Sequence, residues 1–180
     1  MKLLAFTKAE LLLSNTEKGH PFRYFYLSTF GEFPETRTVV NRGVSDELEI
    51  TFFTDSRTPK VEQMKQNNKV SALFYHPDKQ LQLRLYGEAT ILTRRDERAY
   101  APYLKQVLSN ADWTKDYGSV HIPGTPKKDE GTIIYGNTIN LNVIKIKPVH
   151  LDIVLLGVEK HHRSKCKLVE NMWTEKEVVP

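Results

Sequence analysis

Cysteine is almost absent from this 180-residue sequence, in which Cys166 is the only one. The chain can therefore form no intrachain disulfide, and it contains no C-x-x-C metal or redox motif. It also lacks any stretch near the roughly 20 apolar residues that cross a membrane, and the apolar run after Lys2 is too short for a signal peptide. We expect a cytoplasmic protein that does not enter a membrane.

Several motifs of catalytic chemistry are also missing. The sequence has no G-x-S-x-G nucleophile motif, no G-x-G-x-x-G dinucleotide motif and no P-loop. His161 and His162 are adjacent, so in a strand they would point to opposite faces. His76, His121 and His150 have no Cys or Glu at metal-ligand spacing. The sequence thus supports neither a hydrolase triad nor a metal ion.

Positive charge is in slight excess but is not concentrated anywhere. The formal net charge is +4 and the pI is about 9.0, yet lysines and arginines are scattered along the chain. Such mild basicity indicates a solvated surface rather than a nucleic-acid interface. No nucleic-acid partner is predicted.

The sequence is rich in β-type segments. Hydrophobic residues make up 39% and charged residues 27%, as in soluble globular proteins. Tight turns join the early segments and helices are inserted between later ones, which predicts a mainly β fold, an antiparallel β-barrel with flanking helices. We expect one domain over residues 1–180, with an N-terminal helix (1–18), a core barrel (20–92), a helix (93–110) and C-terminal strands (137–180). Strands are expected at 21–30, 36–43, 48–54, 70–76, 80–92, 137–147 and 149–157.

The helix boundaries carry local signals. Thr7–Glu10 has the pattern of a capping box for a first helix that ends near residue 17. Thr58–Pro59 marks the start of a second helix, which buries Val61 and Met64 and ends at Asn67–Asn68. Residues 116–132 are rich in Gly and Pro and are expected to form a loop. The third helix is expected to bury Ala99, Tyr103, Leu104, Val107 and Leu108.

The stretch TFFTDSRTPK, at 51–60, runs from an apolar strand into that second helix. A helix N-terminus carries unpaired N–H groups and the positive end of the helix dipole, so it favours an anion. Thr54, Ser56 and Thr58 add hydroxyl groups, while Arg57 and Lys60 add positive charge. This composition predicts a phosphate site. The alternative is that Thr58 only caps the helix and that the two cations lie in solvent.

Arg37 favours the phosphate interpretation. It lies in segment 36–43, which we expect to pair as a hairpin with segment 48–54. A cation on the first segment would then lie beside the loop at the end of the second.

Four short motifs follow in order along this region: Arg37 with Thr38, Val39 and Val40; Phe53–Thr54; Thr58-x-Lys60; and Gln82 five residues before Gly87. In this order they resemble the pyridoxamine 5′-phosphate oxidase-like family of FMN-binding proteins over residues 20–92. The resemblance returns at the C-terminus in His161-x-Arg163, Trp173 and Pro180.

The resemblance implies an antiparallel split β-barrel with Greek-key order, which forms a homodimer with FMN at the subunit interface. Arg37, Thr58 and Lys60 would hold the phosphate, and Gln82 and Arg163 would complete the site, in part across the interface. Arg57 would substitute for an arginine that the family has where Pro59 stands. The implied FMN contacts are Arg37, Thr38, Val39, Val40, Phe53, Thr54, Arg57, Thr58, Lys60, Gln82 and Arg163.

The chain departs from the true oxidase where that enzyme binds the phosphate of its vitamin substrate. The family's Tyr, Arg and Ser on one helix correspond to Tyr100, Leu104 and Leu108, and a C-terminal Arg corresponds to Glu159. A carboxylate there would repel a phosphate. The resemblance thus implies an FMN protein that is not a pyridoxamine phosphate oxidase. Its substrate cleft would be lined by Arg42, Tyr100 and His161, each of which could instead be a surface or core residue.

Two functions from different classes remain open. The first is a flavin oxidoreductase acting on an unidentified small molecule, in which the flavin carries the redox chemistry. The second is a carrier or sensor that binds flavin without turnover. A shared fold does not distinguish them.

Overall fold

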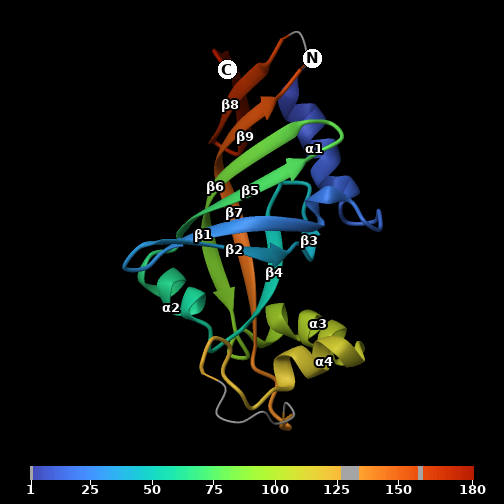
Figure 1. The fold of residues 1–180 in the computed structure, drawn as a ribbon, viewed down its shortest axis with the longest axis vertical. Helices are drawn as coiled ribbons and strands as arrows, with labels where there is room; N and C mark the ends of the chain where they lie inside the picture. Colours follow the sequence, from blue (N-terminus) through green and yellow to red (C-terminus); the bar gives the residue numbers. More distant parts are fainter. Residues whose placement is uncertain (1, 127–133, 158–159) are drawn as a thin grey trace.

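The computed structural model of the chain describes residues 2–126, 134–157 and 160–180 (Figure 1). Both termini lie at one end of the long axis, and α3 and α4 lie at the other. The elements are α1 (Leu3–Leu13), the 3₁₀ turn η1 (Pro21–Arg23), β1 (Tyr24–Phe30), β2 (Pro34–Val40), β3 (Gly43–Val44), β4 (Ile50–Asp55), α2 (Pro59–Gln66), β5 (Lys69–His76), β6 (Leu81–Leu92), α3 (Glu97–Leu108), α4 (Ala111–Gly118), β7 (Leu141–Leu155), β8 (His162–Val169) and β9 (Met172–Val178).

The strands of the described residues form one nine-stranded sheet in which neighbours run antiparallel. Its main order is β2-β1-β5-β6-β7-β4-β3, and β8 and β9 extend it from β7. The predicted mainly β, antiparallel fold with flanking helices is confirmed. Closure into a split barrel and Greek-key order stay predictions.

Two strand predictions were wrong, the first of them in part. Segments 36–43 and 48–54 pair only at the end of the first segment, where Gly43 lies opposite Thr51. Residues Pro34–Val40 form β2, which is a hairpin with β1, while β4 pairs with β7 along its length. Segments 137–147 and 149–157 were expected to be two strands, but Leu141–Leu155 form one 15-residue strand, β7, which contains Pro148. Pro148 stands opposite Gly87, where the β6–β7 register shifts. A Cβ on Gly87 would lie 2.5 Å from the Lys147 carbonyl oxygen, so the lack of a side chain at this residue allows the two backbones to approach closely.

Some of the helix predictions were confirmed and others were wrong. α2 has the predicted start, end and buried Val61 and Met64. α1 begins at Leu3, so Thr7–Glu10 lies inside the helix and is no capping box. In α3, Ala99 and Leu108 are exposed, whereas Tyr100 and Val107 are buried. α4 extends into the predicted loop as far as Gly118, and residues 127–132 of that loop lie outside the described residues.

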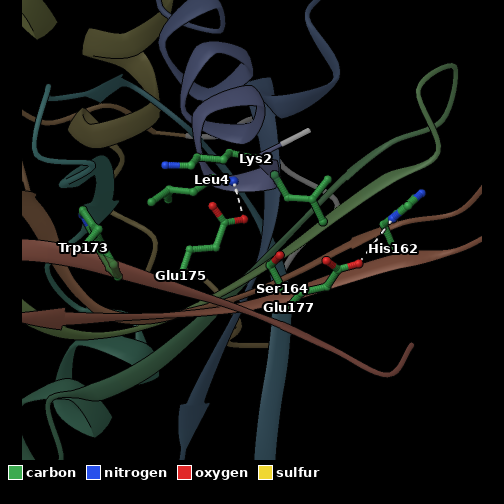
Figure 2. A pocket seen from close by; sticks show the side chains of 8 residues that line it. Lys2, Leu4, His162, Ser164, Trp173, Glu175 and Glu177 are labelled. Atoms are coloured by element: carbon green, nitrogen blue, oxygen red, sulfur yellow. Dashed lines mark hydrogen bonds and ion pairs between the residues drawn. The ribbon is translucent and has the colours of Figure 1, made fainter.

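Contacts near both ends of α1 anchor it to the sheet. Glu175 of β9 points at the first turn of α1, and its Oε1 accepts a hydrogen bond from the Leu4 N–H at 3.2 Å (Figure 2). This contact lies in a pocket of about 350 Å³ between α1 and the β8–β9 hairpin, which His162 and Trp173 also line. A carboxylate at a helix N-terminus stabilises the helix through its unpaired N–H groups and dipole. The described residues contain no helix that is long and apolar enough to cross a membrane.

The other end of α1 carries a buried carboxylate, Glu10, and no sequence pattern connects it to a histidine. Glu10 lies 3.3 Å from His20 Nε2, 3.6 Å from His76 Nε2 and 2.6 Å from Lys79 Nζ. The expectation that His76 stands alone was therefore wrong. Nδ1 of each imidazole accepts a backbone N–H, from Phe22 and from Lys79, so the ring proton lies on Nε2. This tautomer makes Nε2 a donor to Glu10 rather than a metal ligand.

We expect acid to weaken the attachment of α1. Burial, followed by the charge of Lys79, lowers the pKa of His76 below 6.5. Burial raises the pKa of Glu10, but the hydrogen bond and charge of Lys79 outweigh it and leave that pKa below 4.5. Both groups bind protons more readily in the unfolded chain. Stability is therefore lost as pH falls below about 6.5, and further below about 4.5.

Thermal unfolding between pH 7.5 and pH 5 checks this expectation. The wild type should lose more of its melting temperature than His76→Gln over this interval. His150→Gln, which removes an exposed imidazole, should retain the wild-type slope. The same slope in all three proteins would contradict the account.

Candidate phosphate-binding site at the start of α2

The site begins where β4 ends at Asp55 and α2 starts at Pro59. Thr58 is the N-cap residue with extended backbone, as predicted. Its hydroxyl, however, donates to the Asp55 carbonyl oxygen at 2.8 Å and makes no hydrogen bond to the first turn of the helix. The cap side chain therefore leaves the positive end of α2 open to an anion.

Lys60 lies in the first turn of α2 and is half-buried. Its Nζ donates to Thr54 Oγ1 at 3.2 Å, and Thr54 Oγ1 lies 3.2 Å from Thr58 Oγ1. Burial, and then the positive charge of Arg37, lowers the pKa of Lys60. Asp55 and Glu35 act in the opposite direction, but each is paired with an arginine. Among the described residues, no carboxylate forms a salt bridge with Lys60.

Arg37 approaches this cation by a route that the sequence did not predict. It faces Leu27 in the β1–β2 hairpin, and α2 packs against β1 (Figure 1). Its guanidinium donates to Thr29 Oγ1, to Glu35 Oε2 at 2.9 Å and to Gln63 Oε1 at 3.3 Å. The hairpin and α2, rather than a β2–β4 pairing, thus bring the two predicted phosphate cations together.

Two half-buried cations beside hydroxyl groups at a helix N-terminus form an anion site of the kind that holds a phosphate monoester. Burial, and then repulsion from Arg37, lowers the pKa of Lys60, and a bound dianion would offset that repulsion. The residues present therefore fit the phosphate group of FMN.

Comparison with known proteins identifies a family. Residues 6–93 match the family model for the pyridoxamine 5′-phosphate oxidase FMN-binding domain. This range contains Arg37, Thr54, Thr58, Lys60 and Gln82. The chain belongs to this FMN-binding family.

Solved structures support the same fold over nearly the whole chain. A pyridoxamine 5′-phosphate oxidase-related, FMN-binding protein from Nostoc punctiforme is 24% identical, with a TM-score of 0.78 over 97% of this chain and 96% of that one. PhzG from Burkholderia lata 383, in complex with tetrahydrophenazine-1-carboxylic acid, is 13% identical, with a TM-score of 0.76 over 99% and 93%. A protein from Clostridium acetobutylicum related to general stress protein 26 is 17% identical, with a TM-score of 0.60 over 96% and 100%.

Arg57 is the predicted phosphate contact that the geometry argues against. Its guanidinium binds the Asp55 carboxylate through Nε at 3.0 Å and Nη2 at 2.6 Å. The hydrogen bonds that Arg57 donates to Asp55 raise the pKa of Arg57. The same guanidinium donates to the carbonyl oxygens of Ser119, Val120 and His121. Arg57 therefore holds the segment after α4 against the end of β4.

Gln82 and Arg163, the FMN contacts expected to complete the site, are not close to Lys60 within one chain. They flank Val154 on neighbouring strands and face the same side of the sheet. In sheet order, β1 and β5 separate β2 from β6. Arg163 makes two hydrogen bonds to Asp152, at 2.9 and 2.7 Å, which hold its guanidinium on that face. On β2, Thr38 is exposed, and Val39 and Val40 are partly buried.

A second cluster of side chains surrounds Arg42. The ring of Phe53 packs against Tyr103 and Trp113, away from the phosphate site. Arg42 lies 4.0 Å from the centroid of the Trp113 ring, within the range of a cation–π interaction. Burial lowers the pKa of Arg42, and the nearby Tyr117 partly offsets this effect. Of the predicted substrate residues, Arg42 is the one held in a defined, partly apolar environment.

The other predicted substrate residues are placed differently. Tyr100 is 2% exposed and donates its hydroxyl to the Leu141 carbonyl oxygen at 3.0 Å, so it lines no cleft. His161 is exposed. Leu104 packs against the cluster around Tyr100, as expected, but Leu108 is 54% exposed. Glu159 lies outside the described residues.

Proposed function

We propose that the protein is a cytoplasmic FMN-dependent oxidoreductase that acts on a small molecule other than pyridoxamine 5′-phosphate. The observation that carries this proposal is Lys60, a half-buried cation without a salt-bridge partner among the described residues, beside Arg37 at the open end of α2. Membership of the FMN-binding family supports FMN as the ligand.

In this proposal Arg37, Lys60 and the Thr58 hydroxyl hold the phosphate of FMN, and the backbone of β2 at Val39 and Val40 lies along the ribityl chain and ring. FMN supplies the electron-transfer chemistry when it is bound. The protein contributes orientation and charge. Arg42 lies five residues after Arg37, and its stacked guanidinium would orient an acidic group of the substrate.

We further propose that the working unit is a homodimer. The outward face of β1, β5 and β6 exposes five large aromatic residues on neighbouring strands, and Gln82 and Arg163 share this face. Contiguous exposed apolar surface of this kind marks an interaction site. A second copy seated here would place its Gln82 and Arg163 near the first copy's flavin. The aromatic residues are Tyr24, Tyr26, Phe30, Tyr75 and Tyr86.

Light scattering at micromolar concentration should give twice the 20.8 kDa chain mass. Tyr26→Glu, which places a charge in this face, should yield monomers that lose FMN. Leu108→Glu, an exposed site on α3, should leave both mass and FMN content unchanged. A wild-type monomer that retains FMN would contradict the dimer.

Turnover distinguishes the oxidoreductase from a carrier or sensor. The purified protein should be yellow, and anaerobic addition of NADH, NADPH or another two-electron donor should bleach the flavin absorbance, with recovery in air. A protein that holds FMN but is neither reduced by any member of a donor panel nor reoxidised after chemical reduction would instead be a carrier.

A further inference from the structure

One carboxylate, which no sequence motif indicates, belongs to the proposed phosphate site. Glu35 stands two residues before Arg37 on the same face of β2. Its Oε2 accepts a hydrogen bond from Arg37 Nη2 at 2.9 Å, and its Oε1 accepts one from Gln63 Nε2 at 2.5 Å. The Glu35 carboxylate therefore binds the edge of the Arg37 guanidinium that would otherwise be free to bind an anion.

The rest of this network is buried and fixed. Gln63 Oε1 accepts hydrogen bonds from Thr29 Oγ1 at 2.6 Å and from Arg37 Nη2 at 3.3 Å. Thr29 and Gln63 are 2% and 8% exposed. A Cβ on Gly31 would lie 2.8 Å from both Gln63 Nε2 and Glu35 Oε1, so a side chain at residue 31 would require these side-chain ends to move.

The two terminal nitrogens of Arg37, Nη1 and Nη2, differ in how easily their hydrogen-bond partners can be displaced. Nη1 is held by the buried Thr29 hydroxyl and by the Leu27 carbonyl oxygen. Nη2 binds Glu35, whose side chain is 47% exposed and can turn into water. A phosphate dianion that reaches Arg37 and Lys60 must either displace this carboxylate or lie beside it, and like charges in contact repel.

We propose that Glu35 is a specificity-determining residue, the exchangeable counter-ion of Arg37, which weakens the binding of phosphate-bearing ligands and leaves phosphate-free flavin unaffected. This inference rests on the proposed function, because it assumes that the FMN phosphate binds at Arg37 and Lys60. Thr29 and Gln63 hold the guanidinium in place whether Glu35 or phosphate is bound. The FMN affinity of the protein is thus set below what its two cations would give alone.

The test compares FMN and riboflavin binding to apoprotein variants by flavin fluorescence titration. Glu35→Gln keeps an acceptor for Gln63 and removes the charge. It should bind FMN about three- to tenfold more tightly, a modest factor because the carboxylate is half exposed. Riboflavin affinity should not change. Glu35→Ala should act in the same direction, since the effect comes from charge. Glu32→Gln, an exposed residue of the same turn, makes the same change in net charge and should leave FMN affinity at the wild-type value.

The outcomes separate this inference from the proposed function. If wild-type protein binds FMN no better than riboflavin, the phosphate site itself is wrong. If wild type prefers FMN but Glu35→Gln and Glu35→Ala bind it equally well or more weakly, the site stands and the counter-ion role of Glu35 is overturned. Weaker FMN binding in both variants would mean that Glu35 positions Arg37 for phosphate.

Discussion

Replacement of Arg37 or Lys60 by alanine is expected to weaken FMN binding by about 1.5–3 kcal/mol for each variant, the range for hydrogen bonds to charged groups. This corresponds to roughly ten- to 150-fold in affinity. Riboflavin, which has no phosphate, should bind each variant about as well as it binds the wild type. Titration of apoprotein with the two flavins measures the difference.

The structure gives the reason for effects of this size. Lys60 is half-buried and has no salt-bridge partner among the described residues, so a phosphate would provide its principal counter-charge. Arg37 is held by Thr29 and Gln63, so little side-chain entropy is lost when it binds. Because both cations would contact one phosphate, the effects of the two substitutions are not expected to add.

Lys65→Ala is the matched control. Lys65 lies in the same helix and is exposed, and it pairs with Glu62 at 3.3 Å. Its removal should leave FMN affinity within about twofold of the wild type, as for an ordinary surface ion pair. Equal losses of FMN and riboflavin affinity in the Lys60→Ala variant would show that Lys60 supports the fold rather than the phosphate.

Pyridoxamine 5′-phosphate is expected to be a poor substrate or none. In the sequence resemblance, Leu104 and Leu108 correspond to an arginine and a serine with which the family's oxidase would bind the substrate phosphate. Two such bonds, at about 1.5–3 kcal/mol each, correspond to a loss of at least a hundredfold. The Tyr100 hydroxyl is also unavailable, because it is buried and bound to the Leu141 carbonyl oxygen.

Other cations on the 94–108 segment do not replace the arginine and serine that are missing from the substrate-phosphate site. Arg94 donates to the Ile139 carbonyl oxygen at 3.0 Å, and Arg98 and Lys105 are exposed. Steady-state assays with FMN-loaded protein measure the outcome. A kcat/KM above about 10⁴ M⁻¹s⁻¹, within the ordinary range for enzymes, would show that a vitamin-phosphate site exists after all.

Some local signals in the sequence predicted local structure correctly. Thr58–Pro59 and Asn67 mark the ends of α2, and the apolar alternation of β5 and β6 matches their burial. Other signals failed, as with the capping box expected at Thr7–Glu10. Pro148 is an instructive failure. It split one long strand into two expected segments, because a proline in the middle of a strand is tolerated only where a bulge removes the need for its N–H.

Contacts between distant segments could not be predicted in the same way. The sequence analysis placed Arg37 and Lys60 at one site, but it did so through an expected hairpin of segments 36–43 and 48–54. No local pattern indicates that α2 packs against the β1–β2 hairpin. Thr29, Glu35 and Gln63 were missed for the same reason. Glu10, His20 and His76 come from α1, η1 and β5, so no spacing rule connects them.

A crystal structure of the FMN complex tests the central claim most directly. We expect the FMN phosphate within hydrogen-bond distance of Lys60 Nζ and the Arg37 guanidinium, at the open N-terminus of α2. A phosphate bound elsewhere, with Lys60 and Arg37 keeping only the protein partners described above, would contradict the account.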